Sequence, residues 1–134
     1  MTAAETFIDT NVLLYLLSAD ESKADRAEQL VLEGGVVSVQ VLNEFASVAT
    51  RKLGLGIDET RETLAAVRSI CRVEALTEET HDLGMEIAEA HRISLYDAMI
   101  VASAHLARCT TVLSEDMHDG AEMEGVRIRN PFRS

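Results

Sequence analysis

Short, mostly apolar segments alternate with longer helical patterns along this chain, and this alternation limits its fold more than any other feature. The first such segment, Thr6–Ile8, ends at an acid, Asp9. Strands that alternate with helices of this length form a mainly parallel sheet with helices on both faces. The sequence therefore predicts an α/β protein with strands at Thr6–Ile8, Gly35–Val39, Arg72–Leu76, Thr111–Leu113 and Val126–Ile128.

One of the expected helices, Ser94–Ala107, is apolar on nearly every side. A helix of this composition is buried all round. The helix expected at Ile57–Ile70 alternates Glu and Arg with apolar residues and should be half exposed. The other helices are expected at 11–17, 22–32 and 40–53, with one more that begins at Thr77.

Length and composition predict one domain over residues 1–134. A chain of 134 residues can bury a core of its own, and its one Pro leaves no Pro-rich linker. No apolar run approaches the ~18 residues that span a membrane, and the N-terminus lacks the pattern of a secretory signal. Cys71 and Cys109 are expected to be free, buried thiols. The expected location is the cytoplasm, with no membrane association.

Four acids stand at or near the points where a predicted strand leads into a helix: Asp9, Glu44, Asp97 and Asp116. In open parallel sheets, ligands bind at the carboxyl ends of the strands, where these acids would meet. Two such charges 4 Å apart repel by about 4 kcal/mol at an effective dielectric of about 20. A hard cation such as Mg²⁺ offsets this repulsion and keeps open positions for phosphate. The pattern therefore predicts metal-dependent phosphodiester chemistry.

Each acid alone also has an ordinary structural explanation. Asp9 could cap the following helix, and Glu44 could be a surface residue on the flank of an apolar helix face. Asp97 stands three residues after Ser94, which is the spacing of a capping box. Asp116 lies in an acid-rich turn. The order and the local context of all four acids carry the prediction.

Other features of the sequence narrow the possible chemistry. The formal charge of −11 counts against a general nucleic-acid binder, although metal would neutralise part of it and a basic partner protein would suit it. No Gly-rich phosphate loop is present, so no nucleotide cofactor is expected. The four His show no zinc-ligand spacing, and each is expected to be a satisfied structural residue: His81, His91, His105 and His118.

The arrangement resembles the PIN-domain family of nucleases, and specifically a VapC-type toxin of a bacterial or archaeal toxin–antitoxin pair. Four segments carry the resemblance, and they occur in the family's order over essentially the whole chain. They are Phe7-Ile-Asp9-Thr-Asn11, Asn43-Glu44, Ser94-Leu-Tyr-Asp97-Ala-Met-Ile-Val-Ala and Leu113-Ser-Glu-Asp116-Met.

The resemblance implies a three-layer α/β/α sandwich with a mainly parallel central sheet, and a Mg²⁺- or Mn²⁺-dependent endoribonuclease. It also implies a homodimer inhibited by a cognate antitoxin protein. By the same resemblance, the metal-holding and catalytic residues are Asp9, Glu44, Asp97 and Asp116, with Asn11 and Ser114 in support. Asp119 is an outer candidate, and whether it or Asp116 lies closer to the metal stays open.

Cationic side chains are candidates for contacts with RNA phosphates, although each could equally be a solubilising charge. The candidates are Arg51, Lys52, Arg92, Arg127, Arg129 and Arg133.

Three other classes of protein share part of this pattern. A phosphatase of the haloacid dehalogenase type needs a second Asp at the position of Asn11, and a response-regulator receiver needs an acid pair at its start. The main alternative is a non-catalytic module of the same fold that binds protein or RNA without cutting it.

Overall fold

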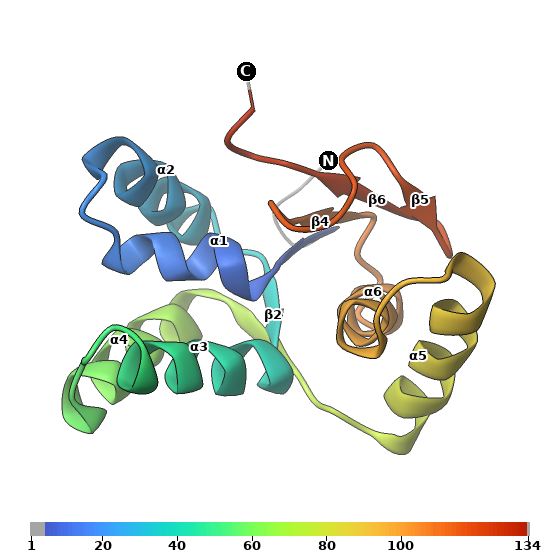
Figure 1. Ribbon diagram of the computed structural model, residues 1–134, viewed down its shortest axis with the longest axis horizontal. Helices are drawn as coiled ribbons and strands as arrows, with labels where there is room; N and C mark the ends of the chain where they lie inside the picture. The colour runs from blue at the N-terminus through green and yellow to red at the C-terminus, as the bar shows by residue number, and fades with distance from the viewer. Residues whose placement is uncertain (1–4, 134) are drawn as a thin grey trace.

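The computed structural model describes residues 5–133 and contains a six-stranded sheet in the order β3-β2-β1-β4-β6-β5. All neighbouring strands pair in parallel except β5, which runs antiparallel to β6. Helices flank this sheet, so the predicted α/β/α sandwich is confirmed (Figure 1). The strands are β1 (Thr6–Ile8), β2 (Val36–Ser38), β3 (Arg72–Glu74), β4 (Thr111–Leu113), β5 (Glu122–Met123) and β6 (Val126–Arg129).

The helices lie where the sequence predicted them, with small differences at their ends. The helix predicted at 11–17 is an α-helix followed by a 3-10 turn, and the one predicted at 40–53 begins and ends earlier. In chain order they are α1 (Thr10–Leu14), the 3-10 helix η2 (Tyr15–Leu17), α2 (Glu21–Leu32), α3 (Val39–Arg51), α4 (Ile57–Ile70), α5 (Glu78–His91) and α6 (Leu95–Leu106).

Capping side chains set several of these boundaries. Ser38 ends β2 and accepts a hydrogen bond from the backbone N–H of Val41, which starts α3 one residue before the predicted position. Ser94 caps α6 and accepts from the N–H of Asp97 at 3.2 Å. This is one half of the capping box expected there. The complete box, with both reciprocal hydrogen bonds, is at the start of α5.

The sequence did not predict β5. This strand has only two residues and joins β6 through Glu124 and Gly125, which have φ of 51° and 75°. Two consecutive residues with positive φ are typical of a type I′ hairpin turn, in which the first position usually holds Asn or Asp. Because Glu is not typical of that position, the hairpin could not be predicted from the sequence.

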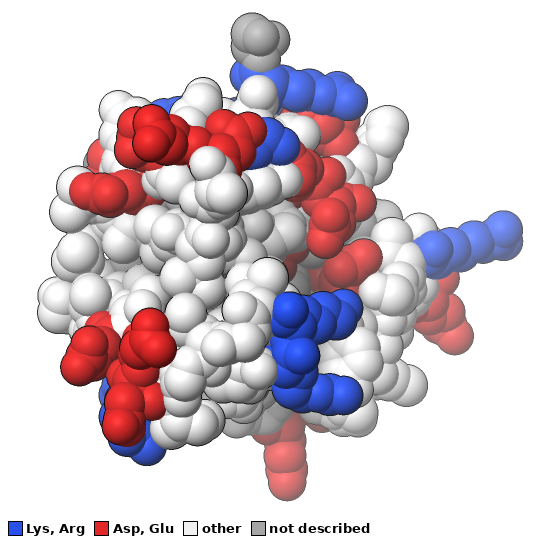
Figure 2. Space-filling view, turned by 60° about the vertical axis from the view of Figure 1, so that its left-hand side comes forward, with Lys and Arg blue, Asp and Glu red and all other residues white. Residues whose placement is uncertain are grey.

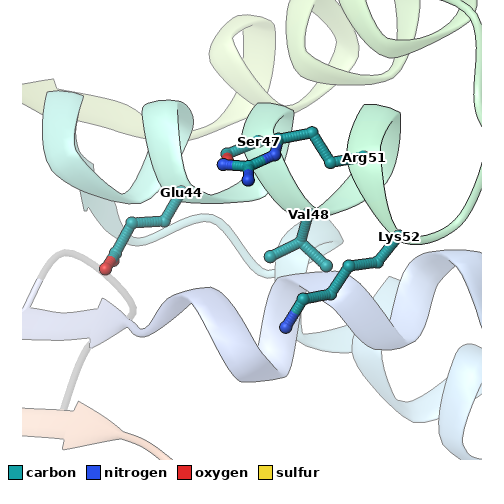
Figure 3. Close-up of a pocket in the computed structure, with 5 residues that line it drawn as sticks. All are labelled: Glu44, Ser47, Val48, Arg51 and Lys52. Atoms are coloured by element: carbon teal, nitrogen blue, oxygen red, sulfur yellow. The ribbon is translucent and has the colours of Figure 1, made fainter.

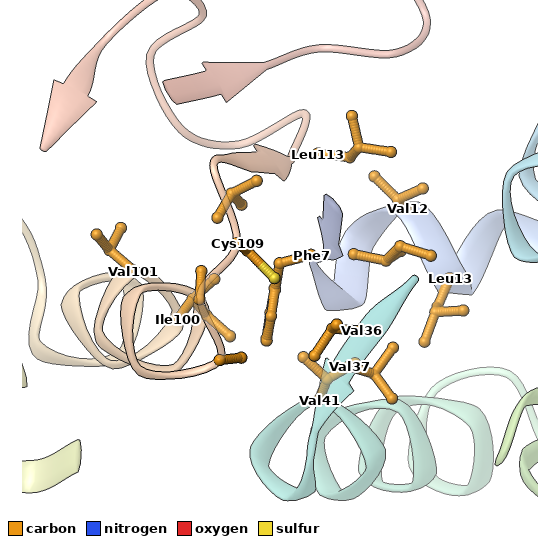
Figure 4. Packing of buried hydrophobic residues seen from close by; sticks show 14 of the residues in the cluster. Phe7, Val12, Leu13, Val36, Val37, Val41, Ile100, Val101, Cys109 and Leu113 are labelled. Carbon is orange, nitrogen blue, oxygen red and sulfur yellow. The ribbon is translucent and has the colours of Figure 1, made fainter. Parts of the chain in front are cut away.

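The core lies between the sheet and the helices and is mostly aliphatic. Figure 4 shows side chains of β1, β2, α1 and α6 meeting around Phe7. The predicted burial of α6 holds for most of its length, but Leu95 and Tyr96 in its first turn are exposed. Neither Cys71 nor Cys109 forms a disulfide, and both are buried, as predicted. Among residues 5–133, no helix combines the length and apolar character needed to cross a bilayer.

The topology creates a crevice beside β1. From this central strand the chain builds β2 and β3 on one side, and later β4 and β6 on the other. The strand order therefore reverses between β1 and β4, and the carboxyl ends of these two strands border the crevice where open α/β sheets bind ligands.

Candidate functional site

Asp9 and Ser114 lie side by side at the reversal point because of the strand register. Ile8 pairs with Leu113, so the next residue of each strand emerges at the same edge of the sheet. Both side chains are buried, and the hydroxyl of Ser114 donates to Asp9 Oδ2 at 2.9 Å. Asp9 is also the N-cap of α1 and accepts from the N–H of Thr10 at 2.7 Å. Asp9 therefore caps α1 and also lies in the candidate site.

Asn11 joins the first loop of the chain to the loop after β4. Its amide nitrogen donates to Asp9 Oδ2 at 3.0 Å, to Asp116 Oδ2 at 3.2 Å and to Ser114 Oγ at 3.3 Å. Its amide oxygen accepts from the N–H of Glu115 at 2.8 Å. These bonds bridge segments about a hundred positions apart, and both Asn11 and Ser114 donate to the carboxylate of Asp9.

Glu44 reaches the same region from the second turn of α3. The hydroxyl of Thr10 donates to Glu44 Oε1 at 2.9 Å, and the amide of Gln40 approaches the same oxygen at 3.5 Å. Gln40 also donates to the carbonyl oxygen of Tyr96 at 3.2 Å, which ties α3 to the start of α6. Thr10 and Gln40 were not predicted from the sequence. Only the position of Gln40, one helical turn before Glu44, could have indicated it.

The four predicted acids line one cavity of about 210 Å³. Asp97 faces it from the first turn of α6, and Asp116 from the loop after β4. Three aliphatic side chains and the exposed ring of Tyr96 complete the wall. Its lining residues are Asp9, Thr10, Asn11, Leu14, Gln40, Glu44, Val48, Tyr96, Asp97, Ile100 and Asp116.

The neighbouring acids of the 115–119 loop point elsewhere. Asp119 accepts from the N–H of Asn130 at 2.8 Å and pairs with Arg133 at 3.4 Å, so it holds the C-terminal segment and does not line the cavity. The carboxylate of Glu115 accepts from the hydroxyl of Tyr15 and pairs with Lys23 at 3.5 Å. The structure therefore brings Asp116 to the cavity and leaves these two acids outside it.

Burial raises the pKa of Asp9 from 3.8 to about 6. Hydrogen bonds from Ser114 and Thr10 stabilise its charged form and limit this rise, whereas the nearby carboxylates of Asp97 and Glu44 add to it. A buried carboxylate that faces two others is a place where a cation would lower the free energy of the charged form.

The donor atoms at this cavity suit a hard divalent cation, because they are carboxylate oxygens with amide and hydroxyl oxygens beside them. Within residues 5–133, no three acids, histidines or cysteines lie close enough together to hold a metal ion as they stand. The acids are instead separated by the hydrogen bonds of Asn11 and Thr10. The chemistry of the donors fits a cation, and coordination would require the carboxylates to draw closer together.

The surface of the molecule has an uneven charge distribution. On the face that Figure 2 shows, acidic side chains gather in several places, and a group of basic side chains lies apart from most of them. Such a surface disfavours loose binding to any polyanion and confines favourable phosphate contacts to a few positions.

A family model for the PIN domain matches residues 6–118. The chain therefore belongs to the PIN domain family, and the resemblance drawn from its four acidic segments is confirmed. A comparison with curated proteins gives no match.

Solved structures show the same fold at low sequence identity. A toxin–antitoxin complex from Klebsiella pneumoniae is 21% identical with a TM-score of 0.72, over 96% of this chain and 99% of that one. VapC20 of Mycobacterium tuberculosis, described as a toxin that cleaves the sarcin–ricin loop, is 22% identical with a TM-score of 0.67, over 83% and 89% of the two chains. VapBC2 from Rickettsia felis, bound to a promoter DNA fragment, is 16% identical with a TM-score of 0.67, over 93% and 97%.

Proposed function

We propose that this protein is a divalent-metal-dependent endoribonuclease and the toxin of a toxin–antitoxin pair. The observation that carries the proposal is the convergence of four carboxylates, from four separate segments, on one cavity at the strand-order reversal of a PIN domain. A chance surface cluster of acids would not include a buried member such as Asp9.

Each residue of the cavity has a role in this proposal. Asp9, Glu44, Asp97 and Asp116 hold Mg²⁺ or Mn²⁺. A bound ion of this kind activates water and offsets the negative charge that grows on the phosphate during hydrolysis. Asn11 and Ser114 hold the Asp9 carboxylate in place through their hydrogen bonds.

The second set of contacts acts on Glu44. Thr10 and Gln40 both approach its Oε1 atom, so they fix the direction in which the carboxylate faces the cavity. Asp119 supports the site from outside by tying the 115–119 loop to the C-terminal segment.

The comparison with solved structures also supports a protein partner. Similar structures are complexes of toxins with antitoxins, which supports a cognate antitoxin for this chain and fits its acidic surface. We also propose that the protein forms a homodimer, is located in the cytoplasm and consists of a single nuclease domain. The charge of −11 favours a narrow choice of RNA over general binding.

The direct test is cleavage of structured RNAs, including tRNA and a sarcin–ricin loop fragment, by the purified protein with Mg²⁺ or Mn²⁺. Asp9→Asn and Asp97→Asn should each reduce the cleavage rate by about 100-fold or more, because a lost carboxylate costs several kcal/mol of charge stabilisation. Asp82→Asn is the matched control, since Asp82 is exposed on α5 and outside the cavity. Cleavage that persists in Asp9→Asn would point to a contaminating nuclease.

Metal binding can be measured without any RNA. Mn²⁺ at 100 times its Kd should stabilise the folded protein by about 2.7 kcal/mol, and the rise in Tm should be lost in Asp97→Asn but kept in Asp82→Asn. Binding of Mn²⁺ with no cleavage of any RNA would instead support a non-catalytic module.

A further inference from the structure

Asp116 has the least support from its own segment among the four acids of the cavity. Asp9 is a buried N-cap, and Glu44 and Asp97 lie within helices. Asp116 is instead exposed on the loop that follows β4. Within residues 5–133, its carboxylate accepts one hydrogen bond, from the amide of Asn11 at 3.2 Å. The direction in which Asp116 faces therefore depends on the contacts that hold its loop.

The residue just before Asp116 is held at both of its carboxylate oxygens. The hydroxyl of Tyr15 donates to Glu115 Oε1, and Nζ of Lys23 lies 3.5 Å from Glu115 Oε2. Lys23 also donates to the hydroxyl oxygen of Tyr15 at 3.1 Å. Tyr15 begins η2 and Lys23 lies in the first turn of α2. One end of the 115–119 loop is thus tied to helices from the start of the chain.

The other end of the loop leads back to the same tyrosine. Asp119 accepts from the N–H of Asn130 at 2.8 Å, which anchors the loop to the C-terminal segment. In that segment, the ring centroid of Phe132 lies 4.7 Å from that of Tyr15, in an edge-on arrangement. Nζ of Lys23 lies 4.6 Å from the Tyr15 ring centroid and 5.7 Å from that of Phe132. The contacts therefore form a closed circuit that starts and ends at Tyr15 and includes the loop of Asp116.

Lys23 differs from the other cations near the site. Figure 3 shows Arg51 and Lys52 in a second cavity, of about 440 Å³, which shares Glu44 with the cavity of the four acids. Neither of these two cations forms an ion pair with any residue between 5 and 133. A positive charge beside a cation site weakens cation binding through repulsion. The charge of Lys23 is instead paired with Glu115, so it can support a cation site through the loop.

We infer that Tyr15 and Lys23 are positioning residues for Asp116. They hold Glu115 outside the cavity and, together with Phe132, fix the 115–119 loop so that the Asp116 carboxylate faces the metal. The inference rests on the proposed function, in which Asp116 is one of the residues that hold the metal. Outer residues that orient metal ligands change metal affinity by about 10- to 100-fold.

The Kd of the full chain for Mn²⁺, measured from the EPR signal of free Mn²⁺, tests the inference. Tyr15→Phe removes one hydroxyl and keeps the ring that packs on Phe132, and Lys23→Met removes the charge and keeps a side chain of similar length. Each should raise the Kd by about 10-fold. Lys23→Arg keeps the cation beside Glu115 and should restore most of the affinity.

Lys52→Met is the matched control, because Lys52 is the other lysine of the sequence and has no ion pair within residues 5–133. Loss of its charge should leave the Kd for Mn²⁺ unchanged or lower it, since one source of repulsion is removed. The expected effect of Lys23→Met has the opposite sign, so a general effect of charge cannot produce it.

A double-mutant cycle with Asp116→Asn separates positioning from a general loss of structure. If Tyr15 and Lys23 act through Asp116, then Tyr15→Phe and Lys23→Met should have no further effect on the Kd for Mn²⁺ once Asp116 is replaced. Losses that add fully to that of Asp116→Asn would overturn the inference. Thermal unfolding without metal should give cooperative transitions for all of these variants.

The remaining outcomes separate this inference from the proposed function. If the unmodified protein binds Mn²⁺ and Tyr15→Phe and Lys23→Met bind it equally well, the inference is overturned and the metal site stands. If the unmodified protein binds no Mn²⁺, the metal site is removed, and amide hydrogen exchange without metal decides whether the loop is held. Severalfold faster exchange at Asp116 and Met117 in both variants would then support the hold on the loop, and unchanged exchange would overturn it.

Discussion

The crevice between β1 and β4 buries polar side chains, whereas the contact between α5 and α6 buries mainly apolar ones. In the crevice, Asp9 and Ser114 are buried polar residues that make several hydrogen bonds, and the pKa of Asp9 is raised by its burial. In the α5–α6 layer, apolar side chains predominate, and Gly84 lets the two helices approach closely. The crevice holds a carboxylate whose charge the surrounding protein disfavours, whereas the helix pair is packed for stability.

The pH dependence of stability should give the largest difference between the two regions. The folded-state pKa of Asp9, about 6, is above its ordinary value of 3.8, so folding favours the protonated form. The stability linked to this proton is fully present below pH 3.8 and is lost as the pH rises through about 6. In the absence of metal, the free energy of unfolding of the unmodified protein should therefore fall between pH 4 and pH 7 by up to about 3 kcal/mol more than that of Asp9→Asn.

Urea unfolding in the presence of a chelator measures this change. Asp82→Asn on the surface of α5 should show nearly the same difference from the unmodified protein at both pH values, because its carboxylate is solvated. If the difference in stability between Asp9→Asn and the unmodified protein is also the same at pH 4 and pH 7, the Asp9 carboxylate is better solvated than its burial indicates.

Two fully buried serines provide the next test. The hydroxyl of Ser114 donates to Asp9 and accepts from the backbone N–H groups of Asp116 and Met117, so Ser114→Ala should cost about 1–3 kcal/mol. The hydroxyl of Ser103 in α6 has no hydrogen-bond partner within residues 5–133, so Ser103→Ala should be neutral or stabilise by about 1 kcal/mol. Thermal unfolding of both variants at pH 7 compares them, and equal losses would remove the contrast between the two regions.

The close approach of α5 and α6 should give the smallest effect. A Cβ atom added at Gly84 would overlap Sδ of Met99 and lie 3.3 Å from its Cγ. Overpacking costs about 1–3 kcal/mol, and the better helix propensity of Ala returns about 1 kcal/mol, so Gly84→Ala should lower stability by about 1 kcal/mol. Gly56→Ala is the control, because its nearest contact is at 3.5 Å. A rise in the Tm of Gly84→Ala would show that the Met99 side chain moves aside freely.

Most of the fold could be predicted because its elements have strong local patterns. The α6 helix was evident from its apolar composition, and α4 from its alternation of charged and apolar residues. The two-residue strand β5 was missed because its pairing depends on a hairpin turn with an unusual Glu.

The members of the site could be predicted only in part. Three of the four acids follow a strand or lie in the first turn of a helix, and Glu44 lies one turn further into its helix, on the flank of an apolar face that the sequence shows directly. Thr10 and Gln40 were missed because their roles depend on a contact between α1 and α3, and such contacts have no local signature.

The sequence by itself determined the order of the helices and of every strand except β5, the buried helix and the four candidate acids, because hydrophobic periodicity and short motifs act over a few residues. Only the tertiary structure decided that Asp116 lines the cavity while Asp119 binds the C-terminal segment. It also decided that Asn11 bridges two loops and that two further cavities share lining residues with the cavity of the four acids. These features depend on the parallel register of β1 with β4, which brings together residues more than a hundred positions apart.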